Sequence, residues 1–481
     1  MQKGDSLKDR YDLPISTSSP AAADLLQEGV DRLLSQNFGP EESLQKAIEA
    51  DDGFAMPHAD LAYTWMLRVQ PAEAKESIQR AQDLAAGVTK REAQHIECIA
   101  QFVAGNSPKS LELIREHLAE FPRDALLSRL AQRHYMQGCS GAGVPNFPEE
   151  LFAMLQGLET HYGDDWSFLG QYAFAHHETG RLDRAYDLAT RSLDLRPTNA
   201  VAAHSVTHVF FERGEAAGGG DFLGDWLTTF DKRATYYIHL SWHQALFELA
   251  QGRYEQAIGL YETEIRPSVV AKSAGSLADS ASLMWRMQVY AGVAPSVPWN
   301  EVRDQAAPAA DRPGPPFRDA HAALAFAAAG DDEALGRMMD GLREVAAKGN
   351  AVAEEVTLPL VQGIQAFAQG EYSQAVQLIE PIAGQLARLG GSHAQREVFE
   401  DTLLEAYLRA EQFDKAEGML QSRLKQRASV RDTFWLGRVQ ASNGQVAAAG
   451  ASLRQATQGW ESADQESAEL VSLNRLAESV G

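Results

Sequence analysis

Apolar positions recur at helical spacing along almost the whole chain, in segments rich in Ala, Leu, Glu, Gln and Arg. Runs in which apolar and polar residues alternate, as in a half-buried strand, are nearly absent. The first 20 residues are polar and end in Ser-Ser-Pro, which predicts a flexible lead-in over residues 1–20. The pattern therefore predicts an all-α chain from Ala21 onward.

A longer pattern repeats about every 33 to 42 positions: an apolar helix ends in Gly, and a small residue follows five positions later in a second helix. Glycine accepts the left-handed backbone at a helix end, and the small residue lets the second helix pack closely. The predicted turn residues are Gly105, Gly138, Gly180, Gly214, Gly252, Gly292, Gly330, Gly370, Glu411 and Gly444. Two further helix pairs are expected before them, around Leu25–Asp51 and Pro57–Ala85.

This interval fits the tetratricopeptide repeat, which is a helix–turn–helix of about 34 residues. The segment Trp166–Asn199 matches the repeat over its full length. We therefore predict an α-solenoid of about twelve helix pairs, each buried against its neighbours. The expected parts are N-terminal and central repeats over 21–306, a Pro-rich loop over 307–318, and C-terminal repeats over 319–481. The Gly-rich stretch after Gly214 is also predicted to be a loop.

Composition and charge limit the classes of partner and the location that we expect. The formal net charge of −23 argues against nucleic acid, whose phosphates need a basic face. The chain contains no run of 18 apolar residues, so the sequence predicts no membrane span. The N-terminus also lacks the apolar core of a secretory signal. Two cysteines are too few for a disulfide framework in a chain of 481 residues. We expect a cytoplasmic protein with reduced thiols, and the sequence leaves homo-oligomers open.

Histidines gather in the central repeats. When each turn Gly is counted as position 15, positions 2, 5, 9, 12 and 13 of the first helix usually face the concave groove of proteins that resemble tetratricopeptide repeats. The count gives His204 at position 5, His208 at 9, His239 at 2, Asp279 at 2 and Arg286 at 9, and it gives position 6 to His243 and His321. Position 6 is not usually a groove position, so those two histidines fit less well. Convergent polar groups among aromatic residues predict a ligand or active site.

The first hypothesis is a small-molecule site, either for binding or for an enzyme of hydrolase or lyase type, with no cofactor. Histidine suits acid–base chemistry near neutral pH. His208 and His243 would transfer the proton, Asp279 would orient a ring, and Arg286 would anchor an anion. The expected substrate contacts are His204, His239, Arg286, His321, Trp242 and Trp285. The structural alternatives are an Asp279–Arg286 ion pair, tryptophans that only pack, and hydrogen-bonded core roles for isolated histidines such as His95, His134 and His393.

Two further hypotheses stay open. A divalent metal could be held by His204, His208, His239 and His243, with an oxygen from Glu212 or Asp279, although neither histidine pair contains the glutamate of an HExxH motif. Alternatively, the groove could bind a basic or extended peptide and serve as a protein-interaction scaffold, the commonest use of such arrays.

The segment from Ala200 to Gly330 resembles the tetratricopeptide repeat protein 38 family. The residues that carry the resemblance are HSVTHVFFERG, IHLSWHQALFELAQGRYEQAIGLYETEIRP, SLADSASLMWRM and FRDAHAALAFAAAG. The resemblance extends more weakly over most of the chain and implies an all-helical superhelix without a separate catalytic domain. It implies no particular activity, so the histidine hypothesis depends on the repeat register alone.

Overall fold

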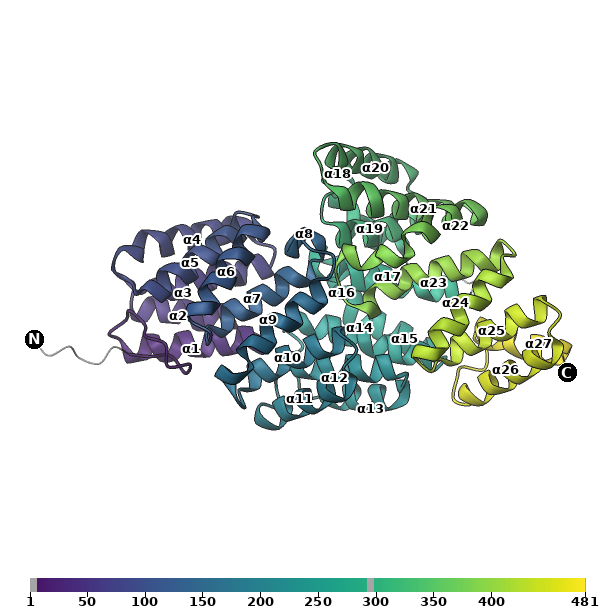
Figure 1. The fold of residues 1–481 in the computed structure, drawn as a ribbon, viewed down its shortest axis with the longest axis horizontal. Coiled ribbons are helices and arrows are strands. Elements are labelled where there is room, and N and C mark those ends of the chain that lie inside the picture. Colours follow the sequence, from purple (N-terminus) through teal and green to yellow (C-terminus); the bar gives the residue numbers. More distant parts are fainter. Residues whose placement is uncertain (1–6, 292–297, 481) are drawn as a thin grey trace, which may run out of the picture. The chain divides into compact units, whose positions relative to one another are not determined.

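The computed structural model describes residues 7–291 and 298–480, which form an all-α solenoid of tetratricopeptide-like helix pairs (Figure 1). Within these ranges the one β-type pairing is an isolated bridge between Lys8 and Pro14. The predicted all-α fold is confirmed. The predicted turn at Gly292 and the first six residues of the lead-in lie outside the described ranges. Among the described helices, none has the length and apolar character needed to cross a membrane.

The chain divides into two compact units, Met1–Val206 with Phe230–Tyr237, and Thr207–Thr229 with Ile238–Gly481. Two helices, α12 (Ala200–Arg213) and α14 (Thr235–Ala250), continue from one unit into the other. The other helices of the first unit are α1 (Pro20–Leu34), α2 (Pro40–Ala50), α3 (Ala55–Leu67), α4 (Pro71–Leu84), η1 (Ala85–Gly87), α5 (Lys90–Val103), α6 (Ser107–Glu120), α7 (Ala125–Met136), α8 (Cys139–Ala142), α9 (Phe147–Tyr162), α10 (Trp166–Glu178) and α11 (Leu182–Leu195).

The second unit begins with α13 (Ala216–Leu227), and its helices continue to the C-terminal end. They are α15 (Tyr254–Leu260), η2 (Tyr261–Ile265), α16 (Arg266–Val270), η3 (Ala274–Ser276), α17 (Leu277–Ala291), α18 (Trp299–Asp311), α19 (Pro316–Ala329), α20 (Asp332–Ala347), η4 (Ala353–Thr357), α21 (Leu358–Ala368), α22 (Tyr372–Ile379), η5 (Glu380–Leu389), α23 (His393–Arg409), α24 (Phe413–Gln426), α25 (Val430–Ser442), α26 (Val446–Gly459) and α27 (Ala468–Val480).

The turns between paired helices follow the predicted repeat. A positive φ angle occurs at every predicted turn residue that the structure describes: Gly105, Gly138, Gly180, Gly214, Gly252, Gly330, Gly370, Glu411 and Gly444. The two early pairs are also present, as α1 with α2 and α3 with α4. The periodic glycine therefore marks a helix end in a left-handed turn, as the sequence predicts.

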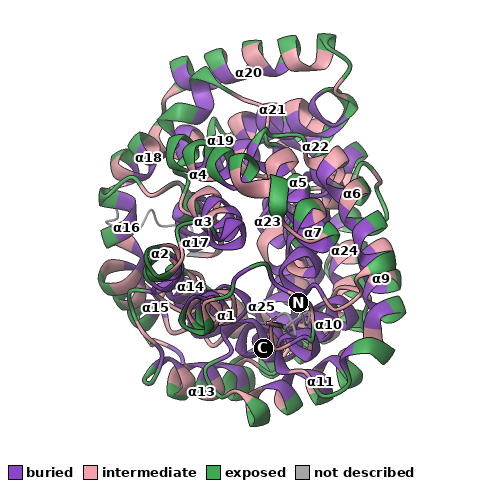
Figure 2. Ribbon diagram, turned by 90° about the vertical axis from the view of Figure 1, so that its left-hand side faces the viewer, coloured by how far each residue is buried: buried purple, intermediate pink, exposed green. Residues whose placement is uncertain are grey.

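First and second helices of a pair differ in burial (Figure 2). In α11, a second helix, the buried residues are Ala185, Leu188, Ala189 and Ser192, the stripe expected of an amphipathic helix. In α12, a first helix, every residue from 200 to 209 is buried. α12 is therefore enclosed, and its polar side chains from 200 to 209 face other protein groups rather than bulk water.

In the first unit, the N-terminal helices contact the chain around the start of α12 and the segment after α13. The backbone N–H of Ala200 donates to the carbonyl of Ser35 at 3.1 Å, and Arg196 pairs with Asp31 at 3.3 Å. Arg233 places its guanidinium 4.0 Å from the ring centroid of Phe38. These contacts join residues more than 160 positions apart, so the first unit closes on itself.

The second unit also closes on itself. Arg431 at the start of α25 donates to the carbonyl of Leu249 at 2.5 Å, and the indole of Trp460 donates to the carbonyl of Ala250 at 3.0 Å. Tyr254 donates to Glu469 on α27 at 2.7 Å. The C-terminal repeats therefore pack against the end of α14 and the start of α15, about 200 positions earlier.

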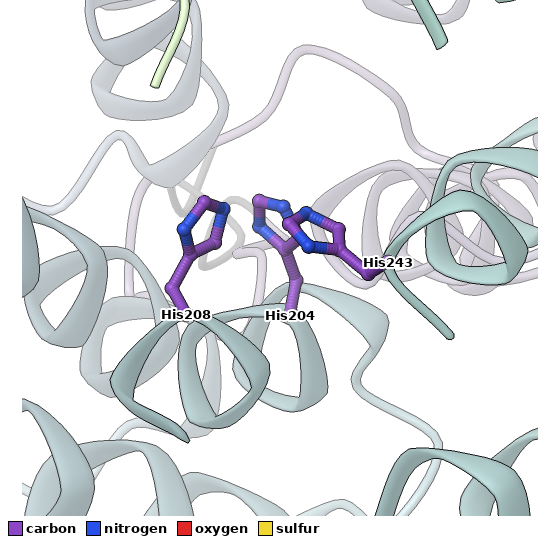
Figure 3. Close-up of side chains that lie close together, drawn as sticks. All are labelled: His204, His208 and His243. Atoms are coloured by element: carbon purple, nitrogen blue, oxygen red, sulfur yellow. The ribbon is translucent and has the colours of Figure 1, made fainter. Parts of the chain in front are cut away.

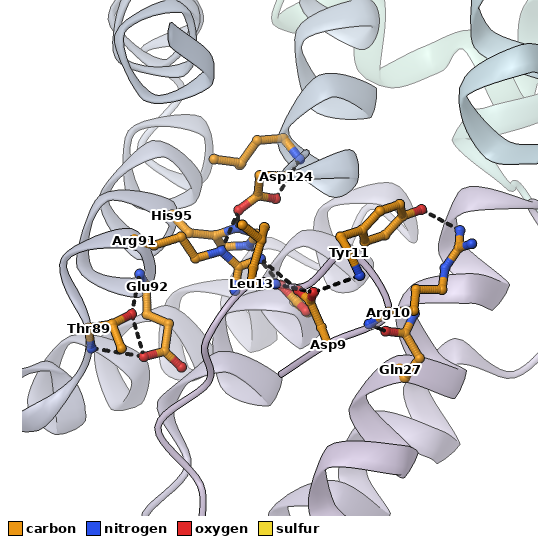
Figure 4. A network of polar contacts seen from close by, with 12 residues as sticks. Asp9, Arg10, Tyr11, Leu13, Gln27, Thr89, Arg91, Glu92, His95 and Asp124 are labelled. Carbon is orange, nitrogen blue, oxygen red and sulfur yellow. Dashed lines mark hydrogen bonds and ion pairs between the residues drawn. The ribbon is translucent and has the colours of Figure 1, made fainter. Parts of the chain in front are cut away.

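The predicted flexible lead-in is wrong for residues 7–19, because several of their side chains are anchored in the first unit (Figure 4). Tyr11 and Ile15 are buried, and the hydroxyl of Tyr11 lies 3.0 Å from that of Ser167. Arg10 pairs with Asp165 at 2.8 Å. The polar residues in this stretch have specific partners on distant helices, which a reading of local composition misses.

Two predicted loops are partly helical. Gly218–Gly220 lie inside α13, where a Cβ on Gly219 would come within 2.4 Å of the Phe247 ring. Glycine is needed there for close packing against α14 rather than for a loop. In the Pro-rich stretch 307–318, residues 307–311 complete α18, which contains Pro308, and residues 316–318 begin α19. The boundary between the two compact units also lies at 206/207 rather than in this Pro-rich stretch.

Candidate histidine site

Helices α12 and α14 carry the predicted histidines. Asn199 precedes α12, and its side chain accepts a hydrogen bond from the N–H of Val201 at 3.2 Å, as a helix cap does. The helix ends at Gly214, where φ is +72° and an added Cβ would lie 2.1 Å from the carbonyl oxygen of Ala428. Both ends of α12 are thus determined by contacts, and its histidines point in defined directions.

His204, His208 and His243 form one group (Figure 3). Each residue offers one ligand atom, and these atoms all lie within 4.8 Å of one another. His204 and His208 are one turn apart on α12, and His243 comes from α14. The exposed fractions are 5%, 0% and 1% respectively, so the group is enclosed.

The size of this group is close to that of a three-histidine metal site. Three points within 4.8 Å of one another fit in a circle with a radius of at most 4.8/√3, about 2.8 Å. Zinc–nitrogen bonds are about 2.0–2.1 Å long. Each nitrogen would therefore have to move by less than about 1 Å to reach bonding distance, which small rotations about the side-chain bonds supply.

A line of ring contacts extends from this group within the second unit. The ring centroids of His208 and His243 are 4.6 Å apart, and those of His243 and His239 are 4.8 Å apart. Nδ1 of His239 lies 3.0 Å from Oδ2 of Asp279 on α17. The indole of Trp242 stacks on His239 at 5.4 Å and meets His243 edge-on at 4.7 Å. His243 therefore lies beside His208, although it is at position 6 of its repeat.

Asp279 and Arg286 bond to different partners in the structure and do not pair with each other. The carboxylate of Asp279 contacts His239, not the proposed proton-transfer pair His208 and His243. Arg286 donates to the carbonyl of Ala394 at 2.6 Å, and its Nε lies 3.9 Å from Oδ2 of Asp401. These partners differ from the predicted Asp279–Arg286 ion pair, because α17 packs against α23.

Trp285 and His321 have partners outside the histidine group. The indole of Trp285 donates to Oγ1 of Thr402 at 2.9 Å, and the ring packs against Phe367. His321 lies between the rings of Phe317 and Phe399, and its Nδ1 donates to the carbonyl of Phe317 at 2.8 Å. Burial lowers the pKa of His321 to about 4, so its ring is neutral at pH 7. Both residues are packed among partners outside the histidine group, and their role as substrate contacts stays a prediction.

Glu212, a suggested metal ligand, bonds to another histidine. Its Oε1 lies 2.8 Å from Nδ1 of His393 at the start of α23. Burial opposes a charge on His393, but Glu212 outweighs it and raises the pKa of His393 to about 9. His393 is hydrogen-bonded as predicted, although its side chain is 38% exposed and is not in the core.

The other two isolated histidines do have core roles. His95 is 1% exposed and contacts the carboxylates of Asp124 and Asp60 at 2.9 and 3.0 Å. His134 is buried, and its Nε2 lies 3.0 Å from the hydroxyl of Ser110. Burial lowers the pKa of His134 to about 4.

The structure adds residues that the sequence reasoning missed. The hydroxyl of Tyr236 lies 3.0 Å from Nδ1 of His204, whose ring stacks on Phe174. A second set of charged residues, including Asp401 and Arg431, lies on α23 and α25. The same register count, applied to the repeats ending at Glu411 and Gly444, gives position 5 for Asp401 and position 2 for Arg431. These two residues could have been found from the sequence by extending the register count to the C-terminal repeats.

No family model matches the chain. Among solved structures, the chain is similar to the human IFIT1 dimer with PPP-AAAA, with 12% identity, a TM-score of 0.42, and coverage of 95% of this chain and 98% of that one. A tetratricopeptide repeat protein from Parabacteroides merdae matches with 12% identity and a TM-score of 0.29, over 66% of this chain and 100% of that one. The APC/C hetero-tetramer Cut9–Hcn1 matches with 10% identity and a TM-score of 0.32, over 97% and 96%. Similarity at this level transfers no ligand or partner to this chain.

Proposed function

We propose that this chain binds a divalent transition-metal ion through His204, His208 and His243 and presents a small molecule to it. The observation that carries the proposal is the enclosed group of three histidine ligand atoms within 4.8 Å of one another. Neutral imidazole suits zinc, copper and nickel. Three protein ligands leave a further coordination position for substrate or water, as in catalytic zinc sites.

The neighbouring residues support the three ligands. Tyr236 bonds to Nδ1 of His204 and would orient that ring with its Nε2 toward the ion. The Asp279–His239 pair packs against His243 and limits its rotation. The indole N–H of Trp242, beside His243, is buried and has no hydrogen-bond partner among the described residues. That N–H is a donor for an oxygen atom of the small molecule.

A bound metal of this kind supplies Lewis acidity and activates water near neutral pH, so hydrolysis is the reaction class we propose. The metal replaces the metal-free proton transfer between His208 and His243 as the preferred hypothesis. A peptide partner in the groove, exclusion of nucleic acid, a cytoplasmic location and membership of the tetratricopeptide repeat protein 38 family all stay predictions from the sequence.

Cobalt(II) titration of the tag-free protein, followed by visible absorption, tests the proposal. We expect a saturable 1:1 signal that zinc abolishes by competition. The variant His208→Gln should weaken binding by more than the roughly 10- to 100-fold that losing an outer-shell partner costs. His161→Gln is the matched control, because His161 lies on the exposed face of α9. Equal cobalt binding by both variants, with both folded by circular dichroism, would refute the site.

A further inference from the structure

A cavity of about 510 Å³ lies within the second unit and is lined by residues of α12, α13, α14, α17, α23, α24, α25 and α26. Its volume falls in the range of ligand pockets, roughly 300–1,000 Å³. Its lining includes the apolar side chains of Phe211, Leu246 and Phe247. The lining also includes charged side chains, and it includes none of the three histidines. The cavity is therefore a second candidate site, independent of metal binding.

Two of its four arginines each make three hydrogen bonds to protein groups. Arg423 bonds to Asp401, Asp432 and Glu397 at 2.8, 3.0 and 3.1 Å. Arg431 bonds twice to Glu469 and once to the carbonyl of Leu249. These two side chains hold the C-terminal repeats together, and they have structural roles.

The other two, Arg286 and Arg427, each have a buried nitrogen without a hydrogen-bond partner among the described residues. Arg286 is 1% exposed and uses Nη2 for the carbonyl of Ala394. Arg427 uses Nη2 for Glu397, and its guanidinium lies 4.5 Å from the ring centroid of Phe211. Nη1 of each residue is buried and has no hydrogen-bond partner among the described residues. Both residues line the cavity, and a buried cationic donor is costly unless an acceptor reaches it.

The surrounding charge limits that acceptor to a weakly charged one. The lining contains four arginines and three carboxylates, Glu397, Asp401 and Asp432, while Arg431 is neutralised by Glu469. Burial disfavours a charge on Glu397, but Arg427 and Arg423 outweigh it and hold the pKa of Glu397 at about 2. A phosphate dianion would bring two negative charges close to the ionised Glu397, whereas a monocarboxylate brings one.

We propose that this cavity binds a small monocarboxylate with an aromatic or aliphatic body. The carboxylate oxygens accept hydrogen bonds from Nη1 of Arg286 and Nη1 of Arg427, and such charge-assisted bonds are the strong class. The apolar body packs against Phe211 and Phe247. The two donors match the two oxygens of a carboxylate and leave a third phosphate oxygen without a partner.

Isothermal titration calorimetry with the full chain tests this proposal, using 3-phenylpropionate as the probe. The neutral 3-phenylpropanamide has the same body without the charge, and inorganic phosphate has the charge without the body. The variant Arg427→Gln removes one donor, and Arg343→Gln on the exposed face of α20 is the matched control. Thermal unfolding of each variant confirms that it is folded. Arg427 is preferred to Arg286 because Arg286 is more deeply buried.

We expect 1:1 binding of the carboxylate, binding of the amide weaker by roughly tenfold or more, and no heat from phosphate. Arg427→Gln should weaken binding of the carboxylate by a similar factor, while Arg343→Gln should bind it as the wild type does. Absence of carboxylate binding, equal affinity for acid and amide, binding of phosphate, or an unchanged affinity in Arg427→Gln would each overturn the proposal. None of these results depends on metal at the histidine site.

Discussion

Replacing His95 with Gln should remove a pH-dependent part of the stability of the first unit. Both ring nitrogens of His95 lie within hydrogen-bond distance of carboxylates, Nδ1 of Asp124 and Nε2 of Asp60. Both nitrogens must donate, so the ring is an imidazolium. Burial opposes this charge, but the two carboxylates outweigh it and raise the pKa of His95 from 6.5 to about 9.

The sign and size of the effect follow from proton linkage. The folded state holds the proton more tightly than the unfolded state, so the stabilisation is fully present below pH 6.5 and is lost as pH rises toward 9. A pKa difference of about 2.5, at 1.36 kcal/mol for each pKa unit, corresponds to about 3 kcal/mol. The opening equilibrium around His95 should therefore increase by roughly two orders of magnitude between pH 6.5 and 9.

Cys98 provides the assay because it lies three residues after His95 on α5 and is 1% exposed. In a Cys139→Ser background, the rate of thiol labelling divided by the rate for an unfolded peptide reports local opening. We expect this ratio to rise steeply with pH in the His95 protein. In His95→Gln the ratio should be higher at pH 6.5 and nearly flat, and the two proteins should converge near pH 9.

Parallel pH profiles for the two proteins would refute this reasoning, because every other titrating group is shared between them. A His95→Gln protein more stable than the parent at pH 6.5 would also contradict it. That result would mean that the free-energy cost of burying the charge exceeds the stabilisation from the two carboxylates.

Two other predictions concern the turns and the second unit. Gly252→Ala should destabilise the fold by more than Gly444→Ala in thermal unfolding: both have a φ of +72°, but only at Gly252 would the new Cβ lie 2.7 Å from that of Ala463. Gly444→Ala should cost about 1 kcal/mol, and equal losses would contradict the contact. Glu212→Gln should lower the pKa of His393 from about 9, as measured by NMR of ¹³C-labelled histidine; titration unchanged near 9 would exclude the pair.

The repeat architecture is readable from sequence because its signals are local. Gly180 and Gly370 end helices in left-handed turns for a reason contained in a few residues. His204 and His208 share a helix face by spacing alone, and the register brings His208 and His243 near each other on neighbouring helices. These features depend on one repeat or on two adjacent repeats.

Contacts between distant helices of one unit could not be predicted from the sequence. Trp285 bonds to Thr402, 117 positions later, and Arg286 pairs with Asp401 because α17 packs against α23. Small rotations between successive repeats add up to determine which distant helices meet, and local patterns do not encode that sum. For the same reason the anchoring of Tyr11 and the second cavity came only from the structure.

Elemental analysis of tag-free protein, purified without chelator and equilibrated with zinc, tests the central claim most directly. We predict about one equivalent of metal in the wild type and in His161→Gln, and little in His208→Gln. Wild-type protein with no more metal than His208→Gln would contradict the claim that His204, His208 and His243 form a metal site.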